Sequence, residues 1–514
     1  MAASREREPL EELRRELEDF IRSLAHPVVT EDDAELFDLS VTEWRLSIEF
    51  GKLIFEAWNS ARSISRRLEG RAYRDGRRLG VFSHHSRAGR TTTLEFREQP
   101  HDTPGGERIL SRDEFSRRLV AMLGHQYPGW RLEHVSHRSD REFSLSTWYT
   151  RGLARHGQNG WAFLALDEHE PAAAADSIVA FGLIWLEWLR HHAGRTVVSG
   201  LKLLMPRAAV ELNAARVKCL NQRAVKVELF EWKPGDAAPR PVDISSLGEL
   251  AARLVVRRQG EVLLERHRER LRELLGDAFD RVSIVPDSTG NALSVRVAGL
   301  EVARVEGDLS PRILFGLEGS VRQYSPKERP KFLALIESAL ERRTARNPNP
   351  QDEFYRLQSE RWLESILISD ITKVDPELSP RLVYSQVPSF AGNDRGVMDI
   401  LSASRSGRLA VIELKLEEEI NLPFQALDYW MRVAHLAEGA KLQEYGYFPG
   451  AQLEASPPRL YLVAPAFRFH STIESLLRYF DPTIEVVRVG INQGWREGAR
   501  VLFRRTRSER PYFE

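Results

Sequence analysis

Three charged residues in the C-terminal third of the chain stand at spacings that suit metal-dependent hydrolysis. Glu413 and Lys415 alternate with apolar residues in the run "AVIELKL", and Asp399 lies in the apolar run "GVMDIL". Residues two apart on a β-strand point to the same face, so we expect Glu413 and Lys415 to project together. Ser406-Gly407 is a turn signal between the two runs. It predicts a hairpin that brings Asp399 beside Glu413.

Two carboxylates and an ammonium in that arrangement predict hydrolysis of a phosphodiester. The reaction requires neutralisation of the charge on a pentavalent phosphorane and a water placed for in-line attack, and bound Mg²⁺ can provide both. Proteins hold Mg²⁺ with a few carboxylates, waters and phosphate oxygens. Charged groups on a buried strand are costly unless they are paired or bind a metal. The alternative interpretation is a surface hairpin on which Glu413 and Lys415 pair with each other.

The elements around these residues predict an α/β domain with a mixed central sheet. Strands and helices alternate along this part of the sequence, which is typical of a sheet with helices packed on its faces. The expected helices are 352–370, 424–439 and 471–480. The expected strands are 381–390, 396–404, 408–417, 459–465 and 484–490.

The order Asp, hairpin spacer and Glu-x-Lys on an apolar strand resembles the PD-(D/E)XK nuclease superfamily, which has the restriction-endonuclease-like fold. Within "FQALDYW", Gln425 and Tyr429 are similar to the Q-x-x-x-Y element of its RecB-like branch. Four residues apart on a helix, they share one face. Met398 stands where the family often has a proline before its first aspartate. The resemblance extends over residues 352–488.

The resemblance implies a role for each matching residue. Asp399 and Glu413 are expected to bind Mg²⁺ or Mn²⁺, and Lys415 to orient or activate the attacking water. Gln425 and Tyr429 are expected to support the site or to contact the nucleic-acid backbone.

The family also has an acidic residue on the helix that precedes these strands. We choose Glu364 in "RWLES" as this further catalytic residue and metal ligand. Glu360, one turn earlier, is the alternative.

The block 113–232 repeats the same order of elements. The run "WAFLALDE" stands where "LAVIELKL" does, and this alignment puts Ala165 in place of Glu413 and Asp167 in place of Lys415. We therefore interpret the block as a degenerate nuclease-like domain whose site is erased, the product of an internal duplication. The alternative is that βαβ elements look alike by composition alone.

A chain of 514 residues is too long for one hydrophobic core, so we expect several domains of α/β or α+β class. The Pro- and Asn-rich run "RTARNPNPQDEF" predicts the clearest boundary. We expect an N-terminal helix and antiparallel meander over 1–110, the nuclease-like domain over 111–238, a middle α/β region over 239–346 and the nuclease domain over 347–514.

Composition excludes several other classes of protein. The 74 basic and 74 acidic residues give a net charge of zero, so a chain coated in positive charge is excluded but a local basic groove is not. One cysteine, Cys219, excludes an intramolecular disulfide framework and a cysteine zinc cluster. The start has acidic residues and no apolar core, unlike a secretory signal. No uninterrupted apolar stretch approaches about 18 residues, so we expect no membrane span and a cytoplasmic location.

These observations favour a Mg²⁺-dependent deoxyribonuclease, an endonuclease of a repair or defence system. The expected partner is a nucleic acid, DNA first. The phosphate-binding motif of ATPases, G-x-x-x-x-G-K-[ST], is absent from the sequence, so any ATP-driven motor would be a separate protein. A homodimer and a separate defence protein are further expected partners. Two alternatives stay open: a nucleic-acid-binding protein that kept the fold without catalysis, and an RNA-directed or ligand-activated nuclease whose N-terminal half is the sensor.

Overall fold

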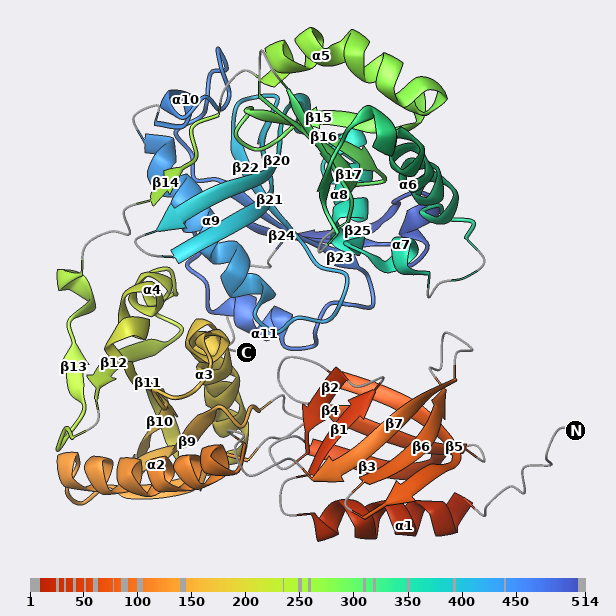
Figure 1. Cartoon of the computed structure of the whole chain (residues 1–514). Coiled ribbons are helices and arrows are strands. Elements are labelled where there is room, and N and C mark those ends of the chain that lie inside the picture. Colours follow the sequence, from red (N-terminus) through yellow and green to blue (C-terminus); the bar gives the residue numbers. More distant parts are fainter. Residues whose placement is uncertain are drawn as a thin grey trace, which may run out of the picture. The chain divides into compact units, whose positions relative to one another are not determined.

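The computed structural model divides the chain into two compact units (Figure 1). Unit 1 comprises 1–214 and 225–244, and unit 2 comprises 215–224 and 245–514. The structure describes residues 10–24, 27–31, 34–39, 43–49, 52–58, 63–76, 78–84, 91–98, 105–138, 145–233, 235–247, 252–257, 260–307, 311–317, 320–347, 349, 352–391, 394–438 and 441–506.

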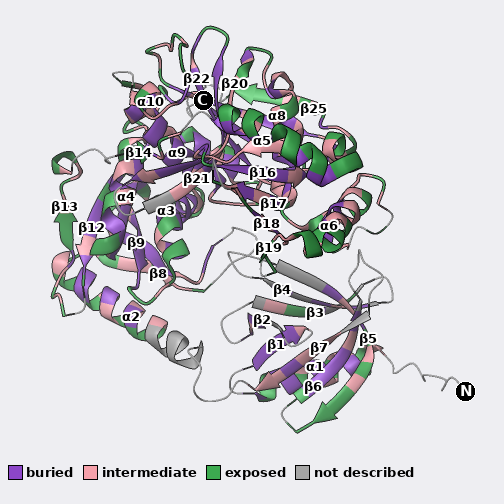
Figure 2. Cartoon of the chain, turned by 45° about the horizontal axis from the view of Figure 1, so that its top comes forward, coloured by how far each residue is buried: buried purple, intermediate pink, exposed green. Residues whose placement is uncertain are grey.

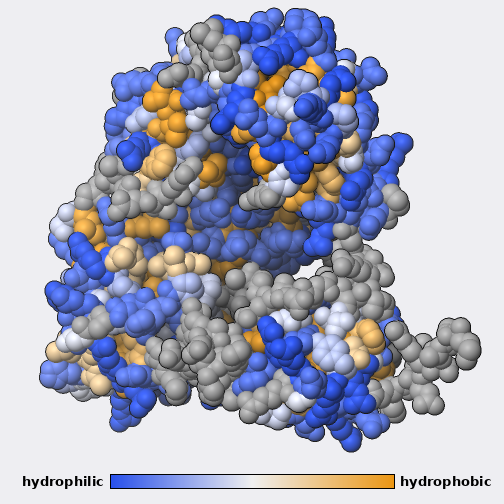
Figure 3. Space-filling view, in the orientation of Figure 1, coloured by the Kyte–Doolittle hydropathy of each residue, from blue (hydrophilic) through white to orange (hydrophobic). Residues whose placement is uncertain are grey.

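The expectation of a mixed α/β protein is confirmed. Among the described residues, strands form four sheets, and helices occur in both units. Buried residues concentrate in the strands and in the helices that pack on them (Figure 2), and helix α3 (Ala172–His192) is buried on all sides along residues 177–186. On the face that Figure 3 shows, hydrophilic residues make up most of the described surface.

The first sheet of unit 1 is antiparallel, in the order β2-β1-β7-β6-β5-β4-β3. Helix α1 (Leu10–Ser23) packs on it through Leu13, Leu17 and Ile21, which recur at helical spacing and are buried. The predicted meander is therefore present. Its strands are β1 (Pro27–Glu31), β2 (Ala34–Asp38), β3 (Glu43–Glu49), β4 (Lys52–Trp58), β5 (Ser63–Asp75), β6 (Arg78–His84) and β7 (Thr91–Glu98).

The second sheet of unit 1 is mixed, in the order β13-β12-β11-β10-β9-β8. Strands β10, β11 and β12 are parallel, whereas β8, β9 and β13 run antiparallel to their neighbours. Its strands are β8 (Arg131–Ser136), β9 (Tyr149–His156), β10 (Asn159–Leu166), β11 (Val197–Pro206), β12 (Lys226–Trp232) and β13 (Arg240–Val242). Its helices are α2 (Gly105–Gln126), α3 (Ala172–His192) and α4 (Arg207–Lys218).

Helix α3 is the one described helix that is long and apolar enough to cross a membrane, by length and composition only. Two thirds of its apolar stretch, 67%, are buried inside the fold, where the helix packs on β10 and β11. This burial is typical of the core helix of a globular domain.

Unit 2 contains a mixed sheet in the order β14-β20-β21-β22-β23-β24-β25, with β22, β23 and β24 parallel. Strand β14 precedes the expected boundary near residue 347, yet it pairs with β20 and so belongs to this sheet. The strands are β14 (Ala252–Leu254), β20 (Leu378–Ala391), β21 (Asp394–Ser404), β22 (Leu409–Leu414), β23 (Arg459–Pro465), β24 (Val486–Ile491) and β25 (Val501–Thr506). The helices around it are α7 (Glu353–Arg356), α8 (Ser359–Ser369), α9 (Leu422–Ala437), α10 (Lys441–Glu444) and α11 (Ile473–Arg478).

The single helix predicted over 352–370 is wrong in one respect, because the structure has two helices there, α7 and α8. Gln358, between them, adopts the left-handed conformation with φ of 43°. A residue in that conformation cannot continue a right-handed helix, so α7 ends and α8 begins at this point.

A second, antiparallel sheet of unit 2 has the order β15-β16-β17-β18-β19. Its strands are β15 (Ser283–Pro286), β16 (Ala292–Val297), β17 (Leu300–Glu306), β18 (Arg312–Phe315) and β19 (Arg322–Gln323), and its helices are α5 (Gly260–Leu275) and α6 (Arg329–Arg342). Ala298 and Gly299, with φ of 44° and 80°, form a two-residue turn between β16 and β17. Positive φ at both positions is the type I′ geometry that suits the twist of a hairpin.

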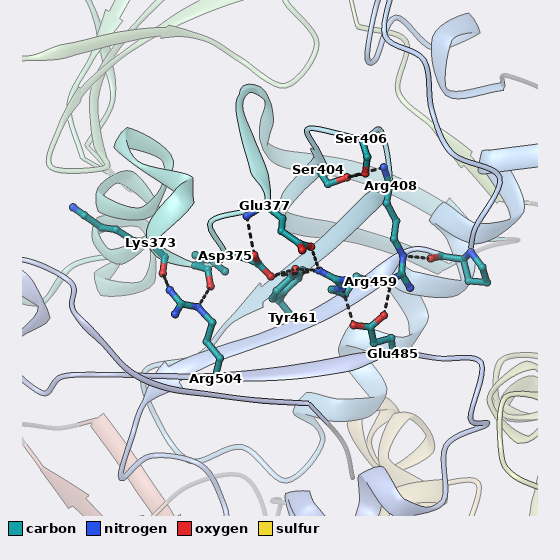
Figure 4. A network of polar contacts seen from close by, with 12 residues as sticks. Lys373, Asp375, Glu377, Ser404, Ser406, Arg408, Arg459, Tyr461, Glu485 and Arg504 are labelled. Atoms are coloured by element: carbon teal, nitrogen blue, oxygen red, sulfur yellow. Dashed lines mark hydrogen bonds and ion pairs between the residues drawn. The ribbon is translucent and has the colours of Figure 1, made fainter. Parts of the chain in front are cut away.

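A network of ion pairs and hydrogen bonds lies at the start of β23, the end of the sheet opposite to Lys415 (Figure 4). The Arg459 guanidinium lies 2.8 Å from Glu377 and 2.8 Å from Glu485. The Tyr461 hydroxyl donates to Asp375 at 2.7 Å. These contacts are all made by side chains of unit 2 and stabilise the end at which β23 begins.

Alanine substitutions at two glycines of unit 2 distinguish the free-energy cost of a strained backbone from the additional cost of a steric clash. A Cβ added to Gly299 would lie 2.1 Å from the Arg361 carbonyl oxygen, whereas one added to Gly276, with φ of 54°, meets nothing within 4 Å. We expect Gly276→Ala to lower the free energy of unfolding by about 1 kcal/mol, and Gly299→Ala by about 3 kcal/mol or more, because the turn must also move away from α8. Urea denaturation measures both, and equal losses would contradict the close approach.

Candidate metal-binding and catalytic site

Strands β21 and β22 place Asp399 beside Glu413, as the predicted hairpin requires. The last regular pair between β21 and β22 is Ile400 with Ile412. The same register, continued by one residue, puts Asp399 opposite Glu413. The Leu414 backbone N–H donates to Asp399 Oδ2 at 2.9 Å. Ile412 and Leu414 lie in the core beneath α8, so Glu413 occupies the opposite face of the strand.

Glu364 of α8 belongs to the same cluster. It is buried, and its carboxylate accepts hydrogen bonds from the Ser385 hydroxyl and from Gln386 Nε2, the latter at 2.7 Å. The same Gln386 nitrogen donates to Asp399 Oδ1 at 3.1 Å. Glu364 and Asp399 therefore face one another across a single amide group.

Lys415 lies between two of the carboxylates. Its Nζ is 3.8 Å from Glu360 Oε2 and 4.0 Å from Glu413 Oε1. Glu360, which the sequence offered only as the alternative to Glu364, is therefore present in addition to it. The structure thus brings together four carboxylates and one ammonium at the end of β22.

Burial and mutual repulsion disfavour the charged form of these carboxylates. Burial raises the pKa of Glu364 to about 7 and raises that of Asp399. For Glu413, burial together with the nearby Asp399 charge raises the pKa well above its ordinary value. Burial alone would lower the pKa of Lys415, but the surrounding carboxylates outweigh it and the pKa ends above its ordinary value. The ammonium therefore stays charged.

The donor set fits a hard divalent cation. Glu413 Oε2 is buried and has no hydrogen-bond partner, and an oxygen of this kind is costly unless a cation or a donor reaches it. Within the described part of the chain, no three acidic, histidine or cysteine side chains are already gathered closely enough to hold an ion. Carboxylates repel one another when no cation lies between them, so they are expected to stand further apart here than they would around a bound ion.

Helix α9 brings the two residues of the Q-x-x-x-Y element to this site. Gln425 lies near the Tyr429 side chain and lowers its pKa slightly. Burial, together with the Glu413 charge, raises the pKa of Tyr429 to about 12, so its hydroxyl stays protonated. A Cβ added to Gly396 would lie 2.6 Å from the Tyr429 ring. Only glycine at position 396 lets this ring lie against β21.

Sequence reasoning missed Gly396 and Gln386. A glycine inside an apolar strand is a signal of close approach by another group, and it precedes Asp399 by three residues. Gln386 carried no comparable signal, because its position depends on a backbone conformation that glutamine rarely adopts.

Asp428, between Gln425 and Tyr429 on α9, is an acidic residue that the cluster does not include. Its two carboxylate oxygens accept from Arg216 Nε at 2.8 Å and Arg216 Nη2 at 2.6 Å. Arg216 is only 2% exposed. This bidentate pair neutralises Asp428 and so leaves it outside the set of metal ligands.

The six described strands of the mixed sheet of unit 1 match six of the seven strands of the mixed sheet of unit 2, which has β14 in addition. Strands β8 to β13 match β20 to β25 in order and in direction, and α3 and α4 connect the parallel strands as α9 and α11 do. The duplication hypothesis requires this agreement in strand order.

The register of the two sheets identifies the positions that correspond. We align Pro206 with Pro465, since each ends the strand that follows the long helix, and then follow the pairings across each sheet. The positions of Asp399, Glu413 and Lys415 are then taken by Arg151, Leu164 and Leu166. No carboxylate remains at any of the three.

This register corrects the alignment made from sequence. Ala165 lies with Phe163 in the core beneath α2, just as Leu414 lies with Ile412 beneath α8. Ala165 therefore corresponds to Leu414, and the alignment that matched Ala165 and Asp167 to the catalytic positions was shifted by one residue.

Comparisons with known proteins add little to this geometry. No model of a known protein family matches the sequence, and no curated protein matches it. Among solved structures, protein VC1899 from Vibrio cholerae is similar at 10% identity with a TM-score of 0.14, over 58% of this chain and 87% of its own. A TM-score of that size carries no argument about the fold.

The raised pKa of Glu364 predicts how the stability of the metal-free protein changes with pH. The Glu364 carboxyl group has a pKa of about 7 in the folded protein, against an ordinary value of 4.5, so the folded state binds its proton more tightly than the unfolded state does. This tighter binding stabilises the fold fully below pH 4.5, and the stabilisation is lost as the pH rises through 7. We expect Glu364→Gln to unfold at higher urea than the wild type at about pH 8, by on the order of 3 kcal/mol, with the gain shrinking toward about pH 5.

The control for this experiment is the exposed Glu474→Gln, which should follow the wild type at every pH. Both titrations are run with a chelator. A Glu364→Gln curve that also follows the wild type would contradict the assignment.

The Arg216–Asp428 pair predicts a strongly non-additive pair of substitutions. Arg216→Met leaves a buried carboxylate without its counter-charge and should cost about 3–5 kcal/mol of unfolding free energy. Arg216→Met combined with Asp428→Leu removes both charges and should recover most of that loss. Denaturant unfolding of the two single variants and the double variant measures the coupling. Additive losses would show that the two charges do not interact.

Proposed function

We propose that unit 2, through the mixed sheet that contains β20 to β25, is a divalent-metal-dependent nuclease of the restriction-endonuclease-like class that hydrolyses phosphodiester bonds. One observation carries the proposal: Asp399 stands opposite Glu413 beside Lys415, and a buried Glu413 oxygen has no hydrogen-bond partner. Structural carboxylates are normally satisfied by donors. An arrangement that leaves one of them unsatisfied suits a ligand with positive charge.

In the proposed reaction the carboxylates hold Mg²⁺ or Mn²⁺, which when bound supplies charge neutralisation at the phosphate and lowers the pKa of a coordinated water. Lys415 stays protonated, because its carboxylate neighbours raise its pKa. Its ammonium can therefore donate to the attacking water or to a phosphate oxygen, but it cannot act as a base. Glu360 holds that ammonium from the solvent side, where its side chain is 42% exposed.

Tyr429 and Gln425 support the site from α9. The Tyr429 hydroxyl keeps its proton and so remains a hydrogen-bond donor, which suits a phosphate oxygen of the substrate backbone. Gly396 fixes how closely the ring approaches β21. We propose DNA as the substrate, cut internally, with the mixed sheet of unit 1 as a nuclease-like domain without a metal site.

The proposal predicts metal-dependent nicking of supercoiled DNA. Glu413→Ala removes a ligand and Lys415→Ala removes the ammonium, so each should slow the reaction at least about 100-fold in Mg²⁺. The initial rate of plasmid nicking measures the loss, and a chelator should abolish the wild-type rate. Glu474→Ala, an exposed acid of α11 in the same domain, should nick at the wild-type rate.

The outcomes separate the competing functions. Nicking that survives both Glu413→Ala and Lys415→Ala contradicts the proposal. A wild-type protein that binds DNA but never cuts it is a binding protein with the same fold. Faster cleavage of a matched RNA strand than of DNA would make RNA the substrate.

A further inference from the structure

Gln386 occupies the space between two of the proposed metal ligands. Its Nε2 donates both to Glu364 Oε2 at 2.7 Å and to Asp399 Oδ1 at 3.1 Å. We propose that Gln386 closes the metal site: its amide takes the place of a bridging cation and must leave before Glu364 and Asp399 can share an ion. This inference rests on the proposed function of the same site.

The other oxygens of these carboxylates are already engaged. Glu364 Oε1 accepts from the Ser385 hydroxyl, and Asp399 Oδ2 accepts from the Leu414 backbone N–H. The two oxygens that remain for a shared ligand are the two that Gln386 holds. A Mg²⁺ ion needs about 2.1 Å to each oxygen, and the carboxylates face one another through the amide nitrogen. The amide hydrogens carry only partial positive charge, and together with Arg361 Nη1, which lies 3.5 Å from Glu364 Oε2, they offset part of the negative charge that an ion would neutralise.

The backbone of Gln386 is strained, and loss of its two side-chain hydrogen bonds would let that strain relax. It has φ of 52°, in the left-handed region that a side chain rarely adopts. It stands between the pairs Ser385–Ile400 and Val387–Met398, where it falls opposite Asp399 but forms no regular pair with it. Local strain of this kind persists only where surrounding contacts hold it. The two hydrogen bonds to charged oxygens are such contacts, so the arrival of an ion both displaces the amide and lets the backbone relax.

A supporting role for Gln386 predicts the opposite behaviour. If the amide only oriented the two carboxylates around an ion bound elsewhere, its removal would loosen the ligands and weaken the binding of metal. If the amide competes with the ion, its removal strengthens binding. The sign of the change in metal affinity therefore decides between the two roles.

The test is a calorimetric titration of the full-length, metal-free protein with Mn²⁺. We expect Gln386→Gly to bind Mn²⁺ about tenfold more tightly than the wild type, the factor expected when an ion no longer displaces a hydrogen bond to a charged group. The matched control is Gln358→Gly. Gln358 is also a left-handed glutamine, with φ of 43°, and its side chain is exposed at the start of α8. The control relieves the same backbone strain and should leave the affinity unchanged.

Two additions keep the experiment decisive. Gln386→Asn tolerates the left-handed conformation but is one methylene shorter, so it should also bind more tightly than the wild type and serves if the glycine variant does not fold. The rise in unfolding temperature on addition of Mn²⁺ should be larger in either variant than in the wild type, because tighter binding stabilises the folded state more.

The failures of the two proposals look different. If Glu413→Ala abolishes Mn²⁺ binding but neither Gln386 variant binds more tightly than the wild type, the closing role of Gln386 is overturned and the metal site stands. If neither the wild type nor the Gln386 variants bind Mn²⁺, both proposals are overturned.

Discussion

The arrangement at the end of β22 depends on repulsion between carboxylates that burial forces together. Asp399 and Glu413 stand opposite each other on neighbouring strands, and Glu364 approaches from α8. Each is shielded from water, so each charge costs more than it would on the surface. The donors around them, Gln386 and the Leu414 backbone among others, are partial compensation. The chemistry of the donors suits a divalent ion, which would offset this cost where protonation does not.

The close packing around the cluster follows from that cost. Gly396 exists as glycine because the Tyr429 ring occupies the volume of a side chain there. The Arg216 guanidinium neutralises Asp428, which would otherwise add a further charge next to Glu413. These residues touch no substrate in the proposed reaction. Arg216 neutralises Asp428, so the uncompensated carboxylates are those that we propose as metal ligands.

The sequence predicted the β21–β22 hairpin that carries Asp399 and Glu413 but not the features that depend on unusual backbone conformations. Glu413-x-Lys415 on an apolar strand, with a glycine turn at Gly407, was sufficient for the register, because Gly407 takes the positive φ of 97° that the turn needs. Gln358 and Gln386 adopt left-handed conformations for which glutamine has no preference. Their tertiary contacts impose them, and no local pattern reveals such contacts.

The one-residue shift in the alignment of the block 113–232 has a different cause. Strand β10 is buried on both faces over most of its length, so its sequence "WAFLAL" has no polar alternation from which to read a register. The ends of the parallel strands, marked by Pro206 and Pro465, were the better guide. At the end of β22 the charged residues Glu413 and Lys415 supplied the alternation themselves.

Arg151 gives the mixed sheet of unit 1 a different charge at the position that corresponds to Asp399. At the position that corresponds to Asp399, a covalently attached cation lies over the Trp185 ring and donates to the carbonyl oxygens of Ser146 and Arg138. An exchangeable ion can be stripped by a chelator or diluted away, whereas a guanidinium cannot. The mixed sheet of unit 1 therefore carries a permanent positive charge at a buried position where the mixed sheet of unit 2 carries a carboxylate.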